Sequence, residues 1–109
     1  MRVENDDVVF GGQITFKFFP KFNVDTLVNS TTPSVNGRST FITSGSVVTI
    51  TNFLYAVDGQ VLKLLGDGTT TIKNNSTIVT NTGADKLLLL NKVYRFTYFQ
   101  SKKLWVEDA

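Results

Sequence analysis

Hydrophobic and polar residues alternate with a period of two along much of this chain. In the stretch GQITFKFF, Ile14, Phe16 and Phe18 fall on one side of an extended backbone, and Thr15 and Lys17 fall on the other. Such alternation is typical of a half-buried strand. No stretch keeps the 3.6-residue period of an amphipathic helix for more than about three turns. The pattern therefore predicts an all-β chain.

Further segments combine this alternation with the β-branched and aromatic residues that strands favour. They are residues 39–43, 46–53, 60–66, 69–75, 76–81, 86–91, 92–99 and 103–108. Spacings of roughly 8 to 12 residues between short strands are typical of antiparallel sandwiches and small barrels. We predict an antiparallel, jelly-roll-like β-sandwich of about eight short strands. The alternative is a β-prism that caps a β-helix.

The length of the chain is that of one ordinary domain. With 109 residues, it can bury about two thirds of the surface that its unfolded form exposes, which is enough for one hydrophobic core. We predict a single all-β domain over residues 1–109, in which residues 1–12 are a lead-in that could link it to a preceding stalk. Proline and asparagine in residues 19–37 predict a long irregular connection.

The absence of two residue types narrows the possible chemistry. The sequence contains no cysteine and no histidine. Disulfides, thiolate zinc sites and cysteine nucleophiles are therefore excluded, as are hydrolases that need an imidazole base or ligand. We expect no metal site and no cofactor.

The charge and hydropathy of the chain limit its partners. A formal net charge of +2, without a long block of like charge, gives no reason to expect nucleic-acid binding. No apolar run approaches the ~20 residues needed to span a bilayer, and the acidic start MRVENDDVVF does not resemble a signal peptide. We expect no membrane association.

The stretch VDGQVLKLLGDGTTTIKNN contains two Asp-Gly pairs, Asp58-Gly59 and Asp67-Gly68. The strand-like segment between them would hold the two carboxylates about 30 Å apart at ~3.3 Å per residue, too far to share a cation. Aspartate and glycine in succession are instead a strong signal for a tight turn, because glycine adopts a positive φ without strain. We interpret both pairs, together with Gly83, as turn residues.

The nine acidic residues offer little for acid–base catalysis. A glycosidase needs two facing carboxyl groups, one with a raised pKa. Most of the acidic residues lie in predicted turns or near the chain ends, where solvent keeps the pKa ordinary. We predict that the chain alone is not an enzyme, while a site assembled from carboxylates of two subunits stays open.

Aromatic side chains are the other candidate binding groups, because their faces stack on sugars and on bases. Tyr55, Tyr94, Tyr98 and Trp105 are therefore candidate glycan contacts. The alternative is that Tyr94, Phe96 and Tyr98, each two residues apart, form one buried strand face. The pattern favours burial of these aromatic residues.

Residues 49–108 contain an ordered series of motifs: ITNF, DGQVLKLLGDG, TTI, STIVTNTGADKLLL and a last hairpin ending in WVE. The preceding TPSVNGRSTFIT fits as a lead-in. In order and spacing, this series resembles a module near the C-terminal end of bacteriophage tail spikes, preneck appendages and related pectate-lyase-like β-helical proteins. The resemblance covers more than half of the chain, and residues 1–35 match it less well.

This resemblance implies a structural part of the virion's host-adsorption apparatus. Such a part would cap or extend a trimeric β-helix, would assemble as a homotrimer with other parts of the appendage, and would contact wall polysaccharide or teichoic acid of the host. In such proteins the catalytic groove belongs to the β-helix, whose repeating coils are not visible in this sequence. The alternative function is a free-standing carbohydrate-binding module that uses Trp105 and nearby tyrosines.

Overall fold

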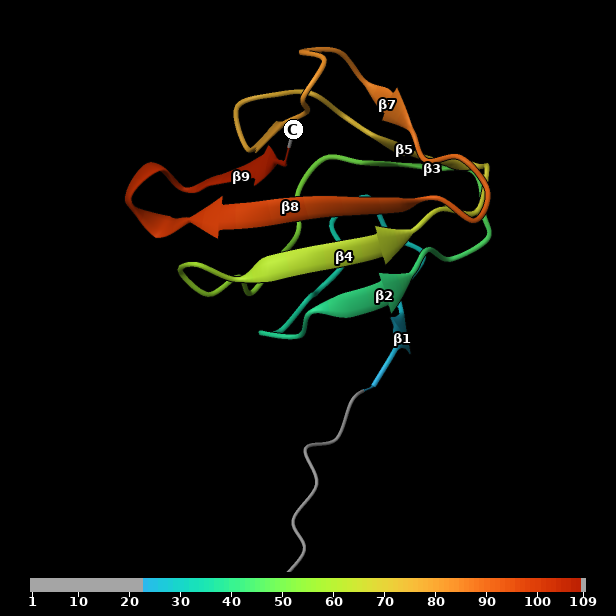
Figure 1. Cartoon of the computed structure of the whole chain (residues 1–109), viewed down its shortest axis with the longest axis horizontal. Helices are drawn as coiled ribbons and strands as arrows, with labels where there is room; N and C mark the ends of the chain where they lie inside the picture. Colours follow the sequence, from blue (N-terminus) through green and yellow to red (C-terminus); the bar gives the residue numbers. More distant parts are fainter. Residues whose placement is uncertain (1–22, 109) are drawn as a thin grey trace, which may run out of the picture.

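The computed structural model describes residues 23–108, which form an all-β structure (Figure 1). Its elements are β1 (Asp25–Thr26), β2 (Thr40–Ile42), β3 (Val48–Ile50), β4 (Val61–Leu65), β5 (Thr70–Ile72), β6 (Ile78–Val79), β7 (Lys86–Leu87), β8 (Val93–Phe99), the 3-10 turn η1 (Gln100–Lys102) and β9 (Leu104–Glu107). The all-β prediction is confirmed. The predicted lead-in, residues 1–12, and the predicted strand GQITFKFF lie outside the described residues.

The strands form two sheets that make up a small β-sandwich, as predicted. The larger sheet has the order β1-β2-β4-β8-β9-β6, and the smaller has the order β3-β5-β7. The expected antiparallel pairing has to be corrected to a mixed one. Four pairs are parallel, namely β1 with β2, β2 with β4, β3 with β5 and β6 with β9. The alternation of side chains has the same period in both kinds of pair, so it could not indicate their direction.

Successive turns of the chain stack on one another in parallel register. Phe41 of β2 pairs with Asp25 of β1 on one side and with Leu64 of β4 on the other. In the chain, β2 is followed by β3 and β4 is followed by β5. These two following strands also pair with each other in parallel, in the smaller sheet. A bridge between Ser34 and Leu54 has the same parallel sense. Parallel stacking of consecutive turns is the arrangement of a β-solenoid.

The two ends of this stack differ. At one end, β7, β8 and β9 pair antiparallel with β5, β4 and β8, respectively, and β9 also pairs in parallel with β6. The larger sheet begins at the other end with β1, and its opposite edge is β6. The smaller sheet has β3 and β7 as its edge strands. Figure 1 shows β1 at the bottom of the view and β7 and β9 at the top, with β3 beside β5 in the upper part. We call the end at β1 the open end of the stack, and the end where β7, β8 and β9 pair antiparallel the closed end.

An aromatic cluster fills the core between the sheets. The ring of Phe53 lies 5.5 Å from that of Trp105 in an edge-on arrangement, and 6.0 Å from that of Phe96. All three side chains are buried, and Leu62 and Leu64 of β4 are fully buried beside them in the same core. The alternation read from the sequence thus places one face of β4 and β8 inside.

Candidate functional site

The four aromatic residues considered as glycan contacts do not form one exposed strip. Trp105 has no exposed surface, and its indole Nε1 donates to the carbonyl of Phe53 at 3.4 Å. Tyr98 is half-buried against the Trp105 ring at 5.0 Å, and Tyr94 is buried. Tyr55, in contrast, is 71% exposed. Trp105 is therefore a core residue, and its assignment as a surface platform for sugars is corrected.

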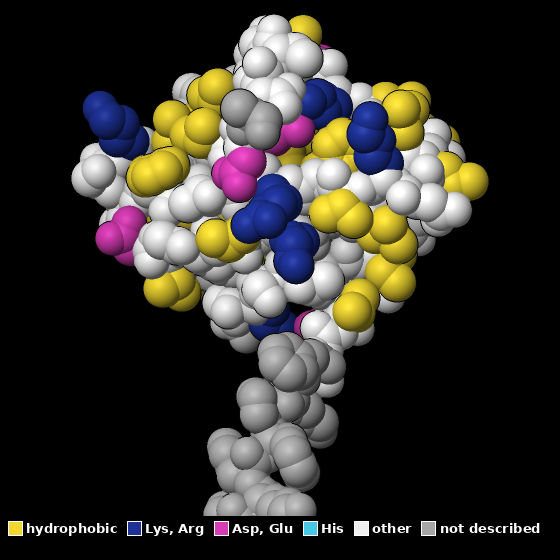
Figure 2. Space-filling view, in the orientation of Figure 1, with side chains coloured by type: hydrophobic (Ala, Val, Ile, Leu, Met, Phe, Trp, Pro, Cys, Tyr) yellow, Lys and Arg dark blue, Asp and Glu magenta, His cyan; other side chains and the backbone are white. Residues whose placement is uncertain are grey.

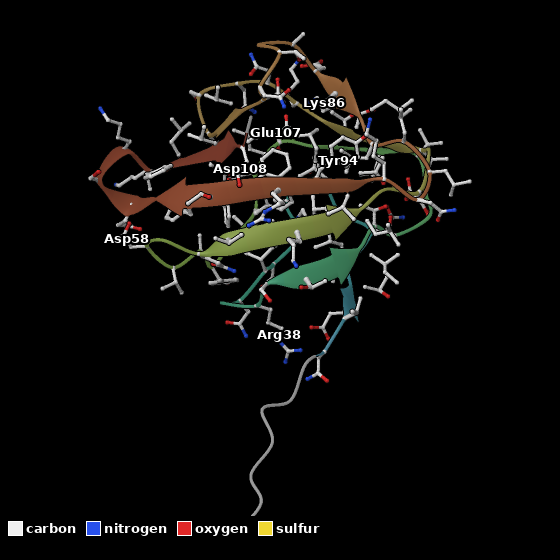
Figure 3. The ribbon with its side chains drawn as sticks, in the orientation of Figure 1. Arg38, Asp58, Lys86, Tyr94, Glu107 and Asp108 are labelled. Carbon is white, nitrogen blue, oxygen red and sulfur yellow. The ribbon has the colours of Figure 1, made fainter. Side chains whose placement is uncertain are left out.

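The two Asp-Gly pairs lie at opposite ends of β4 and share no site. Oδ1 of Asp58 accepts from the backbone N–H of Gln100 at 3.0 Å, which ties its turn to η1 (Figure 3). Gly59, Gly68 and Gly83 all have positive φ, between 72° and 83°.

The carboxylate of Asp67 is the centre of a local hydrogen-bond network. Its Oδ1 accepts from the N–H groups of Thr69 and Thr70 at 2.7 and 2.8 Å, and its Oδ2 accepts from the N–H of Gly45 at 2.7 Å. The hydroxyl of Thr70, a fully buried residue, also donates to it at 2.9 Å. Burial by itself would raise the pKa of Asp67, but these hydrogen bonds outweigh it and hold the pKa well below its usual range. The charge of Asp67 therefore holds two turns of the chain together, a role that we did not assign to it from sequence.

Asn75 repeats this arrangement at the next corner of the chain. Its Oδ1 accepts from the N–H groups of Thr77 and Ile78 at 2.8 and 2.9 Å, and its Nδ2 donates to the carbonyl of Thr51 at 3.0 Å. The segments DGTT and NSTI therefore share one motif, an Asp or Asn two residues before a threonine. This repeat is visible in the sequence but was not recognised there.

We expect the folded state to lose stability in strong acid through Asp67. A carboxyl group whose pKa is lowered on folding contributes stability above its unfolded pKa, about 3.9. That contribution disappears as the pH falls through the lower folded pKa. Asp67→Asn should abolish this part of the acid dependence, which urea unfolding between pH 2 and pH 7 would measure. Asp58→Asn is the matched control, and an equal loss of acid dependence in both variants would contradict the assignment.

A cleft of about 290 Å³ lies at the closed end of the stack, between the loop before β7 and the strands β8 and β9. It is lined by Asn81, Lys86, Lys92, Val93, Tyr94, Arg95, Glu107 and Asp108. Figure 3 shows Lys86, Glu107 and Tyr94 pointing toward one another. We call it the Lys86 cleft.

An ion pair between Lys86 and Glu107 forms the inner wall of the Lys86 cleft. Nζ of Lys86 lies 2.8 and 2.9 Å from the two carboxylate oxygens of Glu107 and also donates to the side chain of Asn81. The two side chains are only 16% and 4% exposed. Glu107 further accepts from the N–H of Asn81 at 3.0 Å. The pair links β7 to β9 across the closed end.

The carboxylates of the Lys86 cleft are already engaged. Glu107 is paired with Lys86 and accepts from the N–H of Asn81. Asp108 accepts from the hydroxyl of Thr97 at 3.3 Å, and its carboxylate lies 3.6 Å from Nε of Arg95. Within residues 23–108, no group of three or more potential metal ligands is close enough to hold an ion. The cleft therefore offers polar groups whose carboxylates are paired with Lys86 and Arg95.

No helix within residues 23–108 is long and apolar enough to cross a membrane.

Comparisons with known proteins identify no family for this chain. No protein-family model, curated protein or solved structure matches it.

Proposed function

We propose that this chain is a non-enzymatic structural module that caps or extends a β-helix in a phage tail spike or appendage. The observation that carries the proposal is the stack of parallel turns with one open and one closed end. Solenoid proteins need such a terminal unit, because an uncovered last turn would expose the core and unpaired backbone groups.

The open end has the backbone groups needed to continue a solenoid. The N–H of Leu27 donates to the carbonyl of Ile42 in β2 at 2.9 Å. Because backbone groups alternate in direction along a strand, the N–H of Thr26 in β1 points away from β2. An edge of this kind can accept a preceding strand in parallel register, as β2 accepts β1.

The closed end supports the same proposal. The antiparallel strands β8 and β9 cover the last turn, and Trp105 of β9 is buried against Phe53 and Tyr98. The order of motifs over residues 49–108 adds the link to tail spikes, and it extends the proposal to a homotrimer in the virion's adsorption apparatus. A carbohydrate-binding module built on Trp105 is not favoured, because this residue is buried.

A chimera tests the capping role. A β-solenoid of known structure that aggregates without its own C-terminal cap would be joined directly to residues 23–108. We expect a soluble chimera that unfolds in a single transition, as measured by calorimetry and light scattering. Two independent transitions, or continued aggregation, would contradict the proposal.

Thr26→Pro provides the matched control for the junction. Proline on an edge strand is tolerated where its missing N–H would face solvent, so the free domain should unfold at an unchanged midpoint. In the chimera, the same change should prevent the new strand pair and restore aggregation.

The mass of the free chain in solution tests the proposed homotrimer separately. A strict monomer of 12.1 kDa would contradict intrinsic trimerisation.

A further inference from the structure

Lys86, Asn81 and Glu107 contact one another on the inner wall of the Lys86 cleft. Nζ of Lys86 donates to Oδ1 of Asn81 at 2.5 Å and lies 2.8 and 2.9 Å from the two carboxylate oxygens of Glu107. Glu107 also accepts from the backbone N–H of Asn81 at 3.0 Å. In Figure 2, basic and acidic side chains meet on the upper part of the face, where Figure 3 labels Lys86 and Glu107. An amine, a carboxamide and a carboxylate are thus held within hydrogen-bond distance of one another.

Burial and further contacts fix this group in place. The side chains of Glu107 and Lys86 are 4% and 16% exposed. The ring of Tyr94 lies 5.8 Å from Nζ of Lys86 and shields it on one side. Nδ2 of Asn81 donates to the carbonyl of Asp108 at 3.2 Å, so both polar atoms of its carboxamide have partners. The carboxamide is therefore held against the amine, in surroundings that disfavour isolated charges.

A second lysine–carboxylate pair near the same loop lacks the carboxamide. Nζ of Lys73 lies 3.4 Å from the carboxylate of Asp85, and the two side chains are 49% and 46% exposed. Within residues 23–108, Nζ of Lys73 donates to no carboxamide oxygen, because that of Asn74 accepts from the N–H of Thr80 instead. Lys73 is therefore an internal comparison for Lys86, with the same charges but no electrophile and little burial.

We propose that Lys86 and Asn81 form an intramolecular amide cross-link, with Glu107 transferring the protons. A lysine amine becomes a nucleophile when it loses a proton, and the carboxylate of Glu107 in contact with Nζ can take it. Nζ then attacks Cγ of Asn81, so that the Nζ–Cγ bond forms and the Cγ–Nδ2 bond breaks. The ammonium group of Lys86 gives up two protons in all, and the departing nitrogen takes both and leaves as ammonium. Glu107 ends as a carboxylate, and no oxidant, reductant or cofactor is consumed.

The cross-link would join the two sheets at the closed end of the stack. Asn81 follows β6 of the larger sheet, and Lys86 begins β7 of the smaller one. A covalent link restricts the unfolded chain, so the cross-linked form should unfold at a higher temperature than the form without the link. The inference goes beyond the capping role and does not depend on it.

Mass spectrometry of the full chain, folded at neutral pH and then digested with trypsin in denaturant, tests the proposal. Trypsin cuts after a lysine whose amine is unmodified. The cross-linked chain should therefore give residues 74–92 as one peptide, lighter than its sequence mass by one ammonia, with normal cleavage after Lys73. Fragment ions should show no break between Asn81 and Lys86.

Two results of this digestion would overturn the proposal. One is an unchanged mass with complete cleavage after Lys86. The other is loss of ammonia together with cleavage after Lys86, which would indicate that an asparagine has closed a ring with its own backbone. The parent chain kept in urea should retain its full mass and lose ammonia on refolding. Equal loss in urea would show that the folded geometry plays no part.

Matched variants test the roles of the three residues. Lys86→Arg keeps the cation of the ion pair but stays protonated, so it should fold and keep its full mass. Glu107→Gln keeps the size of the side chain but cannot take a proton, and the folded variant should cross-link at least tenfold more slowly. Lys73→Gln is the control and should cross-link like the parent. An equal rate in Glu107→Gln would refute proton transfer by Glu107, and the comparison with urea holds even if this variant does not fold.

Discussion

Replacing Trp105 with alanine should lower the free energy of unfolding by about 3–5 kcal/mol, the usual range for removing a large buried aromatic side chain. Trp105 is fully buried, packs against Phe53 and Tyr98, and donates a hydrogen bond to the carbonyl of Phe53. Small domains have a total stability of roughly 5–15 kcal/mol, so much of the variant should be unfolded under mild conditions. Urea unfolding followed by circular dichroism measures the loss.

Tyr55→Ala is the control, because Tyr55 is also aromatic but is mostly exposed. Its unfolding free energy should change by no more than about 0.5 kcal/mol. A Trp105→Ala variant with normal stability would contradict the position of Trp105 in the core. If that stable variant also failed to bind polysaccharide that the parent chain binds, the interpretation of Trp105 as a sugar platform would be restored.

The sequence indicated the strands well because their faces differ in polarity. In β4, Leu62 and Leu64 are buried while Val61 and Lys63 are exposed, and the period of two already showed this difference. The same reasoning correctly favoured burial for Tyr94 and Phe96 of β8. Local alternation was sufficient for these features, because it is set by the pleat of each strand alone.

Pairing between strands could not be derived in the same way. An Asp-Gly pair between two apolar runs usually indicates a hairpin. Here the chain leaves β4 through Asp67-Gly68 and enters β5, which belongs to the other sheet and pairs with β3 and β7. The motif therefore indicated a turn but not its partner strands. The carboxylate of Asp67 supports the corner by accepting from Gly45, a residue of the preceding turn of the chain.

The side chains that meet across the sheet could not be predicted for the same reason. Lys63 and Arg95 are 32 positions apart and look like ordinary solvent-exposed residues in the sequence. Their meeting depends on the register of β4 with β8, and the pairing of Lys86 with Glu107 depends on the contact between β7 and β9. The sequence predicts which residues leave the core, whereas the register decides which of them meet.

Glu107→Ala should destabilise the fold about as strongly as the loss of Trp105, by about 3–5 kcal/mol, because it leaves the nearly buried ammonium group of Lys86 without its partner. It would also leave the N–H of Asn81 without an acceptor. Chemical denaturation at neutral pH measures this effect. Asp25→Ala is the control, since it breaks the pair of Asp25 with Arg38, whose side chains are 31% and 55% exposed, and should cost at most about 1 kcal/mol.

The double variant Lys86→Met/Glu107→Leu separates the value of the Lys86–Glu107 pair from the penalty of an unpaired charge. If most of the loss in Glu107→Ala comes from the isolated ammonium group, the double variant should recover most of the stability, because apolar side chains of similar size often replace a buried ion pair without loss. If it remains as unstable as Glu107→Ala, the hydrogen bonds that Asn81 makes to the pair are what hold β7 and β9 together at the closed end.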